Sequence, residues 1–175
     1  MKFSKLLFGL FILWAISGCR NKGQMIDDKF NGMWRLDKIE SIDKKSGNWA
    51  NDSTFTGWNG LILYDGHGHM GVQITPKGYK DFDANKNIDS LNNEGLKELV
   101  KFYQSNWVYF ANYKVINRTI EHKRLSATNP KDWGSVLTRD IEFREDTLIL
   151  TAHEIVGGKK SRLWWTKCCR YNIDK

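Results

Sequence analysis

Apolar and polar residues alternate along most of this chain, in short runs separated by clusters of turn-forming residues. Alternation at every second residue is typical of β-strands with one buried face. The runs lie at residues 30–41, 57–64, 69–75, 107–116, 118–125, 135–144, 146–155 and 161–168. Such regularly spaced strands indicate an antiparallel barrel or sandwich. We predict an all-β antiparallel barrel of about eight or nine strands, because closure leaves no edge strand exposed.

Residues 94–107 follow a helical period instead. Their apolar side chains have the spacing i, i+3, i+4, i+7, i+11 and form one stripe, made of Leu96, Leu99, Val100, Tyr103 and Trp107. This spacing predicts one amphipathic helix. We expect the helix to pack against the barrel wall or to close one end of the barrel. A helix lying on a membrane is the alternative, but its polar face is not strongly basic.

Two histidines flank a glycine between two of the predicted strands. Asp-Gly at 65–66, between apolar runs, is a strong hairpin signal. His67 and His69 could share one face of a strand and bind a metal, yet zinc requires three or four protein ligands. Only the folding of His122 or His153 onto this turn would complete such a set. We therefore predict a hairpin tip and no metal site.

A second candidate for a metal lies in the polar segment 83–94. Its acidic and amide residues fall at positions 1, 3, 5 and 12 of an EF-hand-like calcium loop, and they are Asp83, Asn85, Asn87 and Glu94. Position 6, where such a loop needs Gly for its sharp turn, is Ile88. Since there is no paired second loop, we expect a polar lid over the barrel mouth, and calcium binding is the alternative.

The N-terminal residues have the composition of a signal peptide. Two lysines provide a basic start, and an apolar run of eleven residues follows at 6–16, too short to span a bilayer. The run ends in the residues ISGC at 16–19, which resemble the lipobox of bacterial lipoproteins. That resemblance implies lipidation of Cys19 and cleavage before it, whereas an ordinary signal peptide is the alternative.

These features divide the chain into a lipoprotein signal peptide at 1–18, a tether at 19–29 and a barrel domain at 30–172. We expect a protein of the bacterial cell envelope, anchored to a membrane by lipid on Cys19 and facing the periplasm or the cell exterior. Cys168 and Cys169 would point to opposite faces of a strand, so we interpret them as packing residues or free thiols.

Charge excludes some partners. Without the two lysines of residues 1–18, 25 of the 27 basic residues remain against 20 acidic residues, and this excess is scattered along the chain. A scattered excess allows weak attraction to anionic lipid headgroups but does not form the basic stripe that nucleic acid needs. The chain also lacks a nucleophile elbow, a phosphate-binding loop and a zinc-hydrolase motif. We expect no cofactor and no nucleic-acid partner.

Several motifs together resemble the bacterial lipocalin-like domain family, which belongs to the calycin group of β-barrels. Residues 32–36 are similar to the G-x-W start of lipocalins, and 59–74 are similar to the second hairpin of the family. The segments 109–130, 135–151 and 162–165 resemble its central stretch, its "R-x-F … D-x-L-x-L" pair and its final "R-L-x-W". The resemblance covers roughly residues 30–168. It implies a barrel whose Trp34 packs across the closed end, preceded by a structural Gly32.

The sequence also departs from the family pattern. Ala111 replaces a frequent Gly, and Lys123 replaces a second His after His122. Trp133 lies one position later than in the family, and residues 76–95 form a longer, more polar insertion. These departures leave the barrel intact as a hypothesis but weaken any inference about shared interior chemistry.

Alternation identifies the side chains that could line the barrel interior. In 107–115 one face carries aromatic residues with polar tips, namely Trp107, Tyr109, Ala111, Tyr113 and Val115. Such a face suits the wall of a small-molecule pocket, and it suits a dry core equally well.

Two polar residues share inward faces with apolar neighbours. Arg139 lies two residues from both Leu137 and Ile141, so it shares their inward face. Its guanidinium must therefore find a partner inside the barrel. It could clamp a ligand carboxylate, or it could stack on Trp34, as the resemblance to lipocalins implies. His122 has the same alternation as Ile120 and could act as a general acid or base, or be hydrogen-bonded in the core.

The leading hypothesis is a membrane-anchored, monomeric lipocalin-like barrel that binds a small, mostly apolar or amphipathic molecule in its interior. The expected binding residues are Trp107, Tyr109, Tyr113, His122 and Arg139. The first alternative is an isomerase or cyclase that uses His122 and Arg139. The second is a structural module of the envelope. Fold analogy alone does not decide between them.

Overall fold

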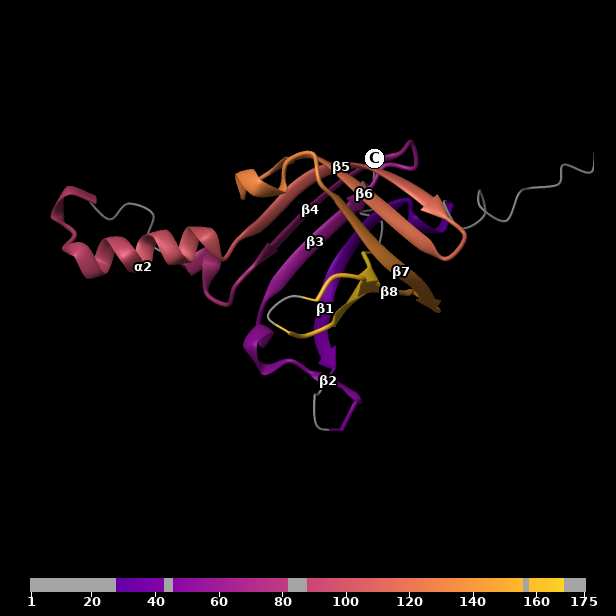
Figure 1. Ribbon diagram of the computed structural model, residues 1–175, viewed down its shortest axis with the longest axis horizontal. Helices are drawn as coiled ribbons and strands as arrows, with labels where there is room; N and C mark the ends of the chain where they lie inside the picture. The colour runs from indigo at the N-terminus through magenta and orange to yellow at the C-terminus, as the bar shows by residue number, and fades with distance from the viewer. Residues whose placement is uncertain (1–27, 43–45, 82–87, 156–157, 169–175) are drawn as a thin grey trace, which may run out of the picture.

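The computed structural model describes residues 28–42, 46–81, 88–155 and 158–168. The strands of this part of the chain are β1 (Gly32–Ile42), β2 (Trp49–Asn51), β3 (Asn59–Tyr64), β4 (His69–Thr75), β5 (Trp107–Ile116), β6 (Thr119–Ala127), β7 (Val136–Arg144), β8 (Thr147–Ala152) and β9 (Ser161–Lys167). They pair in the order β2-β1-β3-β4-β5-β6-β7-β8-β9, and β1 also pairs with β9. Strands β1 and β3–β9 therefore close into an antiparallel barrel, with β2 beside β1 (Figure 1). The predicted all-β barrel is confirmed.

The first and last strands form the seam of the barrel. β1 pairs with β3 only over residues 32–35, and with β9 over residues 34–41. Beyond Arg35, the edge of β1 that paired with β3 is no longer bonded to it. Farther along β1, residues Glu40–Ile42 pair with β2. Both partners of the seam, and every strand between them, lie within residues 28–168. This segment therefore contains the complete hydrogen-bonded barrel and its core.

Aromatic side chains close one end of the barrel. Phe30 and Trp34 are 0% and 2% exposed, and Trp34 Nε1 donates to the carbonyl oxygen of Phe30 at 2.8 Å. The ring of Phe143 lies 5.1 Å from Phe30 and 6.1 Å from Trp34, between centroids. The chain enters β1 through Gly32, whose φ of +118° is one that residues with a Cβ rarely adopt. The start of β1 thus plugs the barrel.

Alternation along the strands fills the adjoining half of the barrel. Inward-facing residues at the closed end and in the middle are buried, among them Ile62, Tyr64, Met70, Val72, Ala111, Tyr113, Ile120, Ile141, Leu148 and Trp165. The interior of an eight-stranded barrel is just wide enough for such side chains to fill. This half is a packed core.

The hairpin prediction for residues 65–68 is confirmed, because this turn joins β3 to β4. Asp65 accepts hydrogen bonds from the backbone nitrogens of His67 and His69, at 2.7 and 3.0 Å, and from His69 Nδ1 at 2.6 Å. Desolvation alone would raise the pKa of Asp65, but these bonds lower it to about 2. The side chains of the turn thus stabilise the turn itself.

The amphipathic helix forms, but its expected position is wrong. α2 (Asn93–Gln104) has no buried residue, and Figure 1 shows it extending away from the barrel. Phe102 stacks on Tyr79 of the short helix η2 (Tyr79–Asp81) at 5.1 Å between centroids. Trp107 belongs to β5 and not to the helix. An apolar stripe shows that a helix has an apolar face, but not which surface that face will meet.

Several predictions concern residues outside the described part of the chain. These are the signal peptide, the lipidated Cys19, the tether up to residue 27, most of the calcium-loop ligands and Cys169. The end of that loop is described, and it contains the short helix η3 (Ile88–Ser90) before α2 begins. Cys168 is a free, partly buried cysteine.

Candidate functional site

The exposure of inward-facing side chains changes along the barrel. On β5, Ala111 is 1% exposed, Tyr109 is partly exposed and Trp107 is 42% exposed. The same change occurs on β7, from buried Ile141 to partly exposed Arg139 and Leu137, and on β9, from Trp165 to Leu163. The barrel is therefore filled at one end and opens to solvent at the other. We call this open end the mouth, lined by Trp107, Tyr109, Arg124, Leu137, Arg139 and Leu163.

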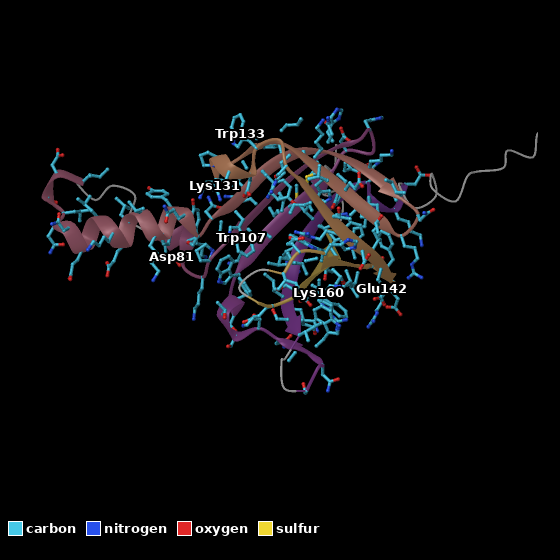
Figure 2. All side chains as sticks on the ribbon, viewed as in Figure 1. Asp81, Trp107, Lys131, Trp133, Glu142 and Lys160 are labelled. Atoms are coloured by element: carbon cyan, nitrogen blue, oxygen red, sulfur yellow. The ribbon has the colours of Figure 1, made fainter. Side chains whose placement is uncertain are left out.

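Three aromatic rings form one side of the mouth. Phe55, Trp58 and Trp107 contact one another, with centroid distances of 5.0 Å for Phe55–Trp58, 5.7 Å for Phe55–Trp107 and 5.2 Å for Trp58–Trp107. Figure 2 shows Trp107 where β5 begins, near the point at which α2 leaves the barrel. All three rings retain solvent exposure. They offer an apolar surface that the fold leaves uncovered.

A polar cluster fixes the segment that carries two of these rings. Asp52 caps the short helix η1 (Ser53–Phe55) by accepting from the backbone nitrogen of Thr54, at 3.0 Å. It also accepts from Ser41 Oγ at 2.9 Å and from Lys159 Nζ at 3.0 Å. Burial would raise the pKa of Asp52, but the hydrogen bonds from Lys159, Thr54 and Ser41 lower it to about 2. The cluster joins η1 to β1 and to the segment before β9.

A cavity of about 260 Å³ lies between β1 and this segment. Leu36, Ile39, Phe55 and Trp58 provide its apolar lining, and Asp37, Lys38, Asn51 and Asp52 its polar lining. It lies where β1 no longer pairs with β3, so the space follows from the strand pairing described above. Its volume lies below the range of about 300–1,000 Å³ that is usual for ligand pockets, so it suits only one part of a ligand. A second pocket, of about 350 Å³, is lined mainly by polar residues including Arg118, Asp140 and Glu142.

Below the mouth, a histidine is hydrogen-bonded between two tyrosines. His122 is 1% exposed, and its Nε2 lies 3.1 Å from the Tyr64 hydroxyl while its Nδ1 lies 3.1 Å from the Tyr109 hydroxyl. Burial, together with the positive charges of Arg139 and Arg124, lowers the pKa of His122 to about 3. Burial also raises the pKa of Tyr109 to about 12 and that of Tyr64 still further above its usual value. All three groups are therefore neutral at neutral pH.

This hydrogen-bonded chain leaves one hydroxyl hydrogen unused. A neutral imidazole donates through one nitrogen and accepts through the other, so one tyrosine donates to His122 and the other accepts from it. Tyr64 is 0% exposed, whereas Tyr109 is partly exposed at the mouth. An unused donor costs least where it can reach solvent or a ligand. We therefore assign the donor role to Tyr64, which leaves the Tyr109 hydrogen free to bond at the mouth.

Two arginines point into the mouth from neighbouring strands. On β6, Arg124 Nη2 lies 3.1 Å from Asp132 Oδ1, and its Nε donates to Ser135 Oγ at 2.8 Å. On β7, Arg139 Nη1 donates to Glu154 Oε2 and, at 3.0 Å, to the carbonyl oxygen of Thr138. Each guanidinium has one carboxylate partner, which offsets the cost of partial burial.

The predicted binding residues lie at different depths in the barrel. Trp107, Tyr109 and Arg139 lie at the mouth, whereas His122 lies beneath Tyr109. Tyr113 is packed in the core, with its ring 5.0 Å from that of Tyr64. A ligand deep in the interior would meet this packed core, whereas the side chains at the mouth remain partly exposed.

The alternative role of Arg139, stacking on Trp34, is not found among the described contacts. Arg139 pairs with Glu154 at the mouth, and Trp34 lies at the closed end. The cation over the Trp34 ring is Lys167, with Nζ 4.9 Å from the centroid.

Four residues of the candidate site were not predicted from the sequence, namely Arg124, Phe55, Trp58 and Glu154. Arg124 could have been predicted, because residues 120, 122 and 124 are each two apart and therefore share the inward face of the strand. The other three lie outside the regular strands, where side-chain direction follows no period.

Two kinds of feature are absent from the described part of the chain. Among these residues, no group of three or more His, Cys, Asp or Glu side chains is arranged to hold a metal ion. Nor does any helix in this part of the chain have the length and apolar character needed to cross a membrane.

The family comparison agrees with the fold. The sequence matches the model of the lipocalin-like domain family over residues 31–168, a range that contains every strand described above. No curated protein matches the sequence. A lipocalin-like protein from Bacteroides uniformis is 14% identical, with 80% of this chain and 99% of that chain covered and a TM-score of 0.41. A mutant of the fluorescent protein UnaG is 11% identical, with 81% and 98% covered and a TM-score of 0.38.

Proposed function

Because the chain belongs to the lipocalin-like domain family, we propose that it binds one small, mostly apolar molecule at the mouth of its barrel. The observation that carries this proposal is the change in exposure along the inward faces. Phe55, Trp58 and Trp107 are inward or rim residues that the fold leaves partly exposed, although burial would stabilise them. A bound apolar molecule would cover these rings, and the few polar groups beside them would orient it.

The geometry favours binding over acid–base catalysis. In the isomerase or cyclase alternative, His122 transfers a proton and Arg139 holds an anionic group. The two side chains do come from neighbouring strands, with Ile120 of β6 paired to Arg139. However, both ring nitrogens of His122 are hydrogen-bonded to tyrosines, and a pKa of about 3 makes the imidazole a weak base at neutral pH. His122 therefore suits a role in positioning Tyr109.

The binding proposal can be tested with a neutral, apolar fluorophore such as N-phenylnaphthylamine and the chain from residue 28 to 175, which contains the complete barrel. Trp107→Ala should weaken binding about fivefold, the equivalent of roughly 1 kcal/mol of lost apolar contact. Phe110→Ala is the matched control, because Phe110 lies on the same strand but is 60% exposed on the outer face. Equal loss in both variants, or loss only in Phe110→Ala, would show that the probe does not bind at the mouth.

We further propose that lipid on Cys19 anchors the protein to a membrane of the bacterial envelope. The basic start, the apolar run and the single cysteine after small residues support this proposal. Growth of expressing cells with a clickable fatty acid should label the wild type and the Cys168→Ser variant. The Cys19→Ser variant should remain unlabelled. If labelling persists without Cys19, or requires Cys168, the anchor is wrong.

A further inference from the structure

We infer that the molecule bound at the mouth carries an anionic group, and that Glu154 occupies the place of this group on Arg139 until the molecule binds. This inference rests on the function proposed above and adds the chemical class of the ligand, which is an apolar body with an attached carboxylate or similar anion.

Arg139 has hydrogen-bonding capacity that the protein does not use. Its side chain is only 13% exposed, and it comes from an inward-facing position of β7 next to buried Ile141. The guanidinium has five N–H donors on three nitrogens. Within the described residues only Nη1 donates, to Glu154 and to the carbonyl of Thr138. Nε and Nη2 therefore have no protein acceptor in this part of the chain, and an anion that replaces Glu154 can bind two nitrogens of the guanidinium at once, which the single contact of Glu154 does not.

Glu154 is suited to leave when such an acceptor arrives. It lies beyond the end of β8, so no ladder hydrogen bond of the strand fixes its position. Its side chain is 37% exposed, against 13% for Arg139. A carboxylate with this exposure regains hydration easily, and water weakens an ion pair that has one such partner. The exchange of one carboxylate for another is thus nearly balanced, and burial of the apolar body of the ligand favours the exchange.

The second arginine shows the contrast. Arg124 is bound by Asp132, and Ser135 accepts from its Nε. Its partners lie in the turn before β7, whose helix η4 (Pro130–Asp132) is capped by Asn129. Arg124 thus fixes the loop that borders the mouth, and Arg139 is left as the site for an anion. The free hydrogen assigned to Tyr109 adds one more donor at the mouth without a matching acceptor.

The test compares two probes with the same aromatic skeleton, anionic anilinonaphthalene sulfonate and neutral N-phenylnaphthylamine, on the chain from residue 28 to 175. Glu154→Gln keeps the size of the side chain but removes the competing charge. It should raise the ratio of the affinity for the sulfonate to the affinity for the neutral probe about fivefold. Arg139→Gln should lower the ratio of the affinity for the sulfonate to the affinity for the neutral probe about tenfold.

Glu142→Gln is the matched control for net charge. Glu142 is a carboxylate on β7 that pairs with Arg144, and Figure 2 places it away from Trp107. This variant should bind both probes as the wild type does. The inference fails, while the binding function stands, if Glu154→Gln and Glu142→Gln change the affinity for the sulfonate equally. It also fails if Glu154→Gln raises the affinity for both probes equally. If neither probe binds to any variant, the proposed function itself fails.

Discussion

The burial of His122 has a measurable consequence for stability below neutral pH. In the folded protein the pKa of His122 is lowered from 6.5 to about 3, by burial first and then by Arg139 and Arg124. Between these two values the unfolded chain binds a proton that the folded chain does not. Stability is therefore complete above pH 6.5 and falls as the pH falls from 6.5 toward 3.

The size of the loss follows from the width of this window. One group with an unmatched proton changes the free energy of unfolding by about 1.4 kcal/mol per pH unit. Acidification from pH 7 to pH 5 crosses about one and a half units of the window, so the wild type should lose about 2 kcal/mol through His122 alone. The carboxyl of Asp52, with a pKa lowered from 3.8 to about 2, titrates below this range and adds little to it.

The His122→Gln variant isolates the contribution. Glutamine retains a donor and an acceptor for the tyrosine hydroxyls but does not titrate, and the variant should lose about 1–3 kcal/mol at pH 7 through imperfect hydrogen bonds. Urea denaturation followed by tryptophan fluorescence gives the free energy of unfolding of both proteins at pH 7 and pH 5. The difference in free energy of unfolding between the wild type and the variant should be about 2 kcal/mol smaller at pH 5 than at pH 7. If both proteins lose the same amount, His122 is not the buried neutral group described here.

Three further predictions concern single positions. Gly32→Ala should lower the free energy of unfolding by about 1–3 kcal/mol, because a residue with a Cβ is strained at a φ of +118°. The added Cβ itself has room, since its nearest atom is 3.6 Å away. An unchanged midpoint in urea denaturation would contradict this prediction. Asp52→Asn should lower the free energy of unfolding by about 1–3 kcal/mol at pH 7, because it leaves Lys159 without its carboxylate. The variant should also lose less stability than the wild type from pH 3.8 toward 2, where Asp65 still titrates; an equal loss in both proteins would exclude Asp52 as a source. Gly71→Ala should change thermal stability by less than about 0.5 kcal/mol, because the atom that its Cβ would meet at 2.9 Å belongs to the exposed ring of Phe110; a loss above about 1 kcal/mol would show that this ring is fixed.

Much of the fold follows from the period of the sequence. Each of the eight predicted runs contains a strand of the barrel, because inward and outward positions differ in every one of them. β2 was missed because its three residues are too few to show a period. The helix at 93–104 was found by the same reasoning, but its position was not, because its partner surface is not encoded in its own spacing.

The candidate site was predictable only where it lies on strands. Alternation placed Arg139 and His122 on inward faces, and the strand pairing brings them to neighbouring strands. The depth of each residue along the barrel was not predictable, because the period of a strand does not show which end will be open. For the same reason Tyr113 was grouped with Tyr109, although the first is packed in the core and the second lies at the mouth.

The seam between the first and last strands has a consequence for how the chain acquires its structure. Trp34 of β1 pairs with Lys167 of β9, so the barrel cannot close until the chain through Lys167 has left the ribosome. Contacts between such distant residues make folding slow compared with helical proteins, because a long loop must be ordered before the contacts stabilise it. Until then the apolar faces of the early strands remain uncovered. The interval between synthesis and closure is thus the period in which this chain is most prone to aggregation. It is also the period in which the chain could still pass through a narrow channel in an extended form.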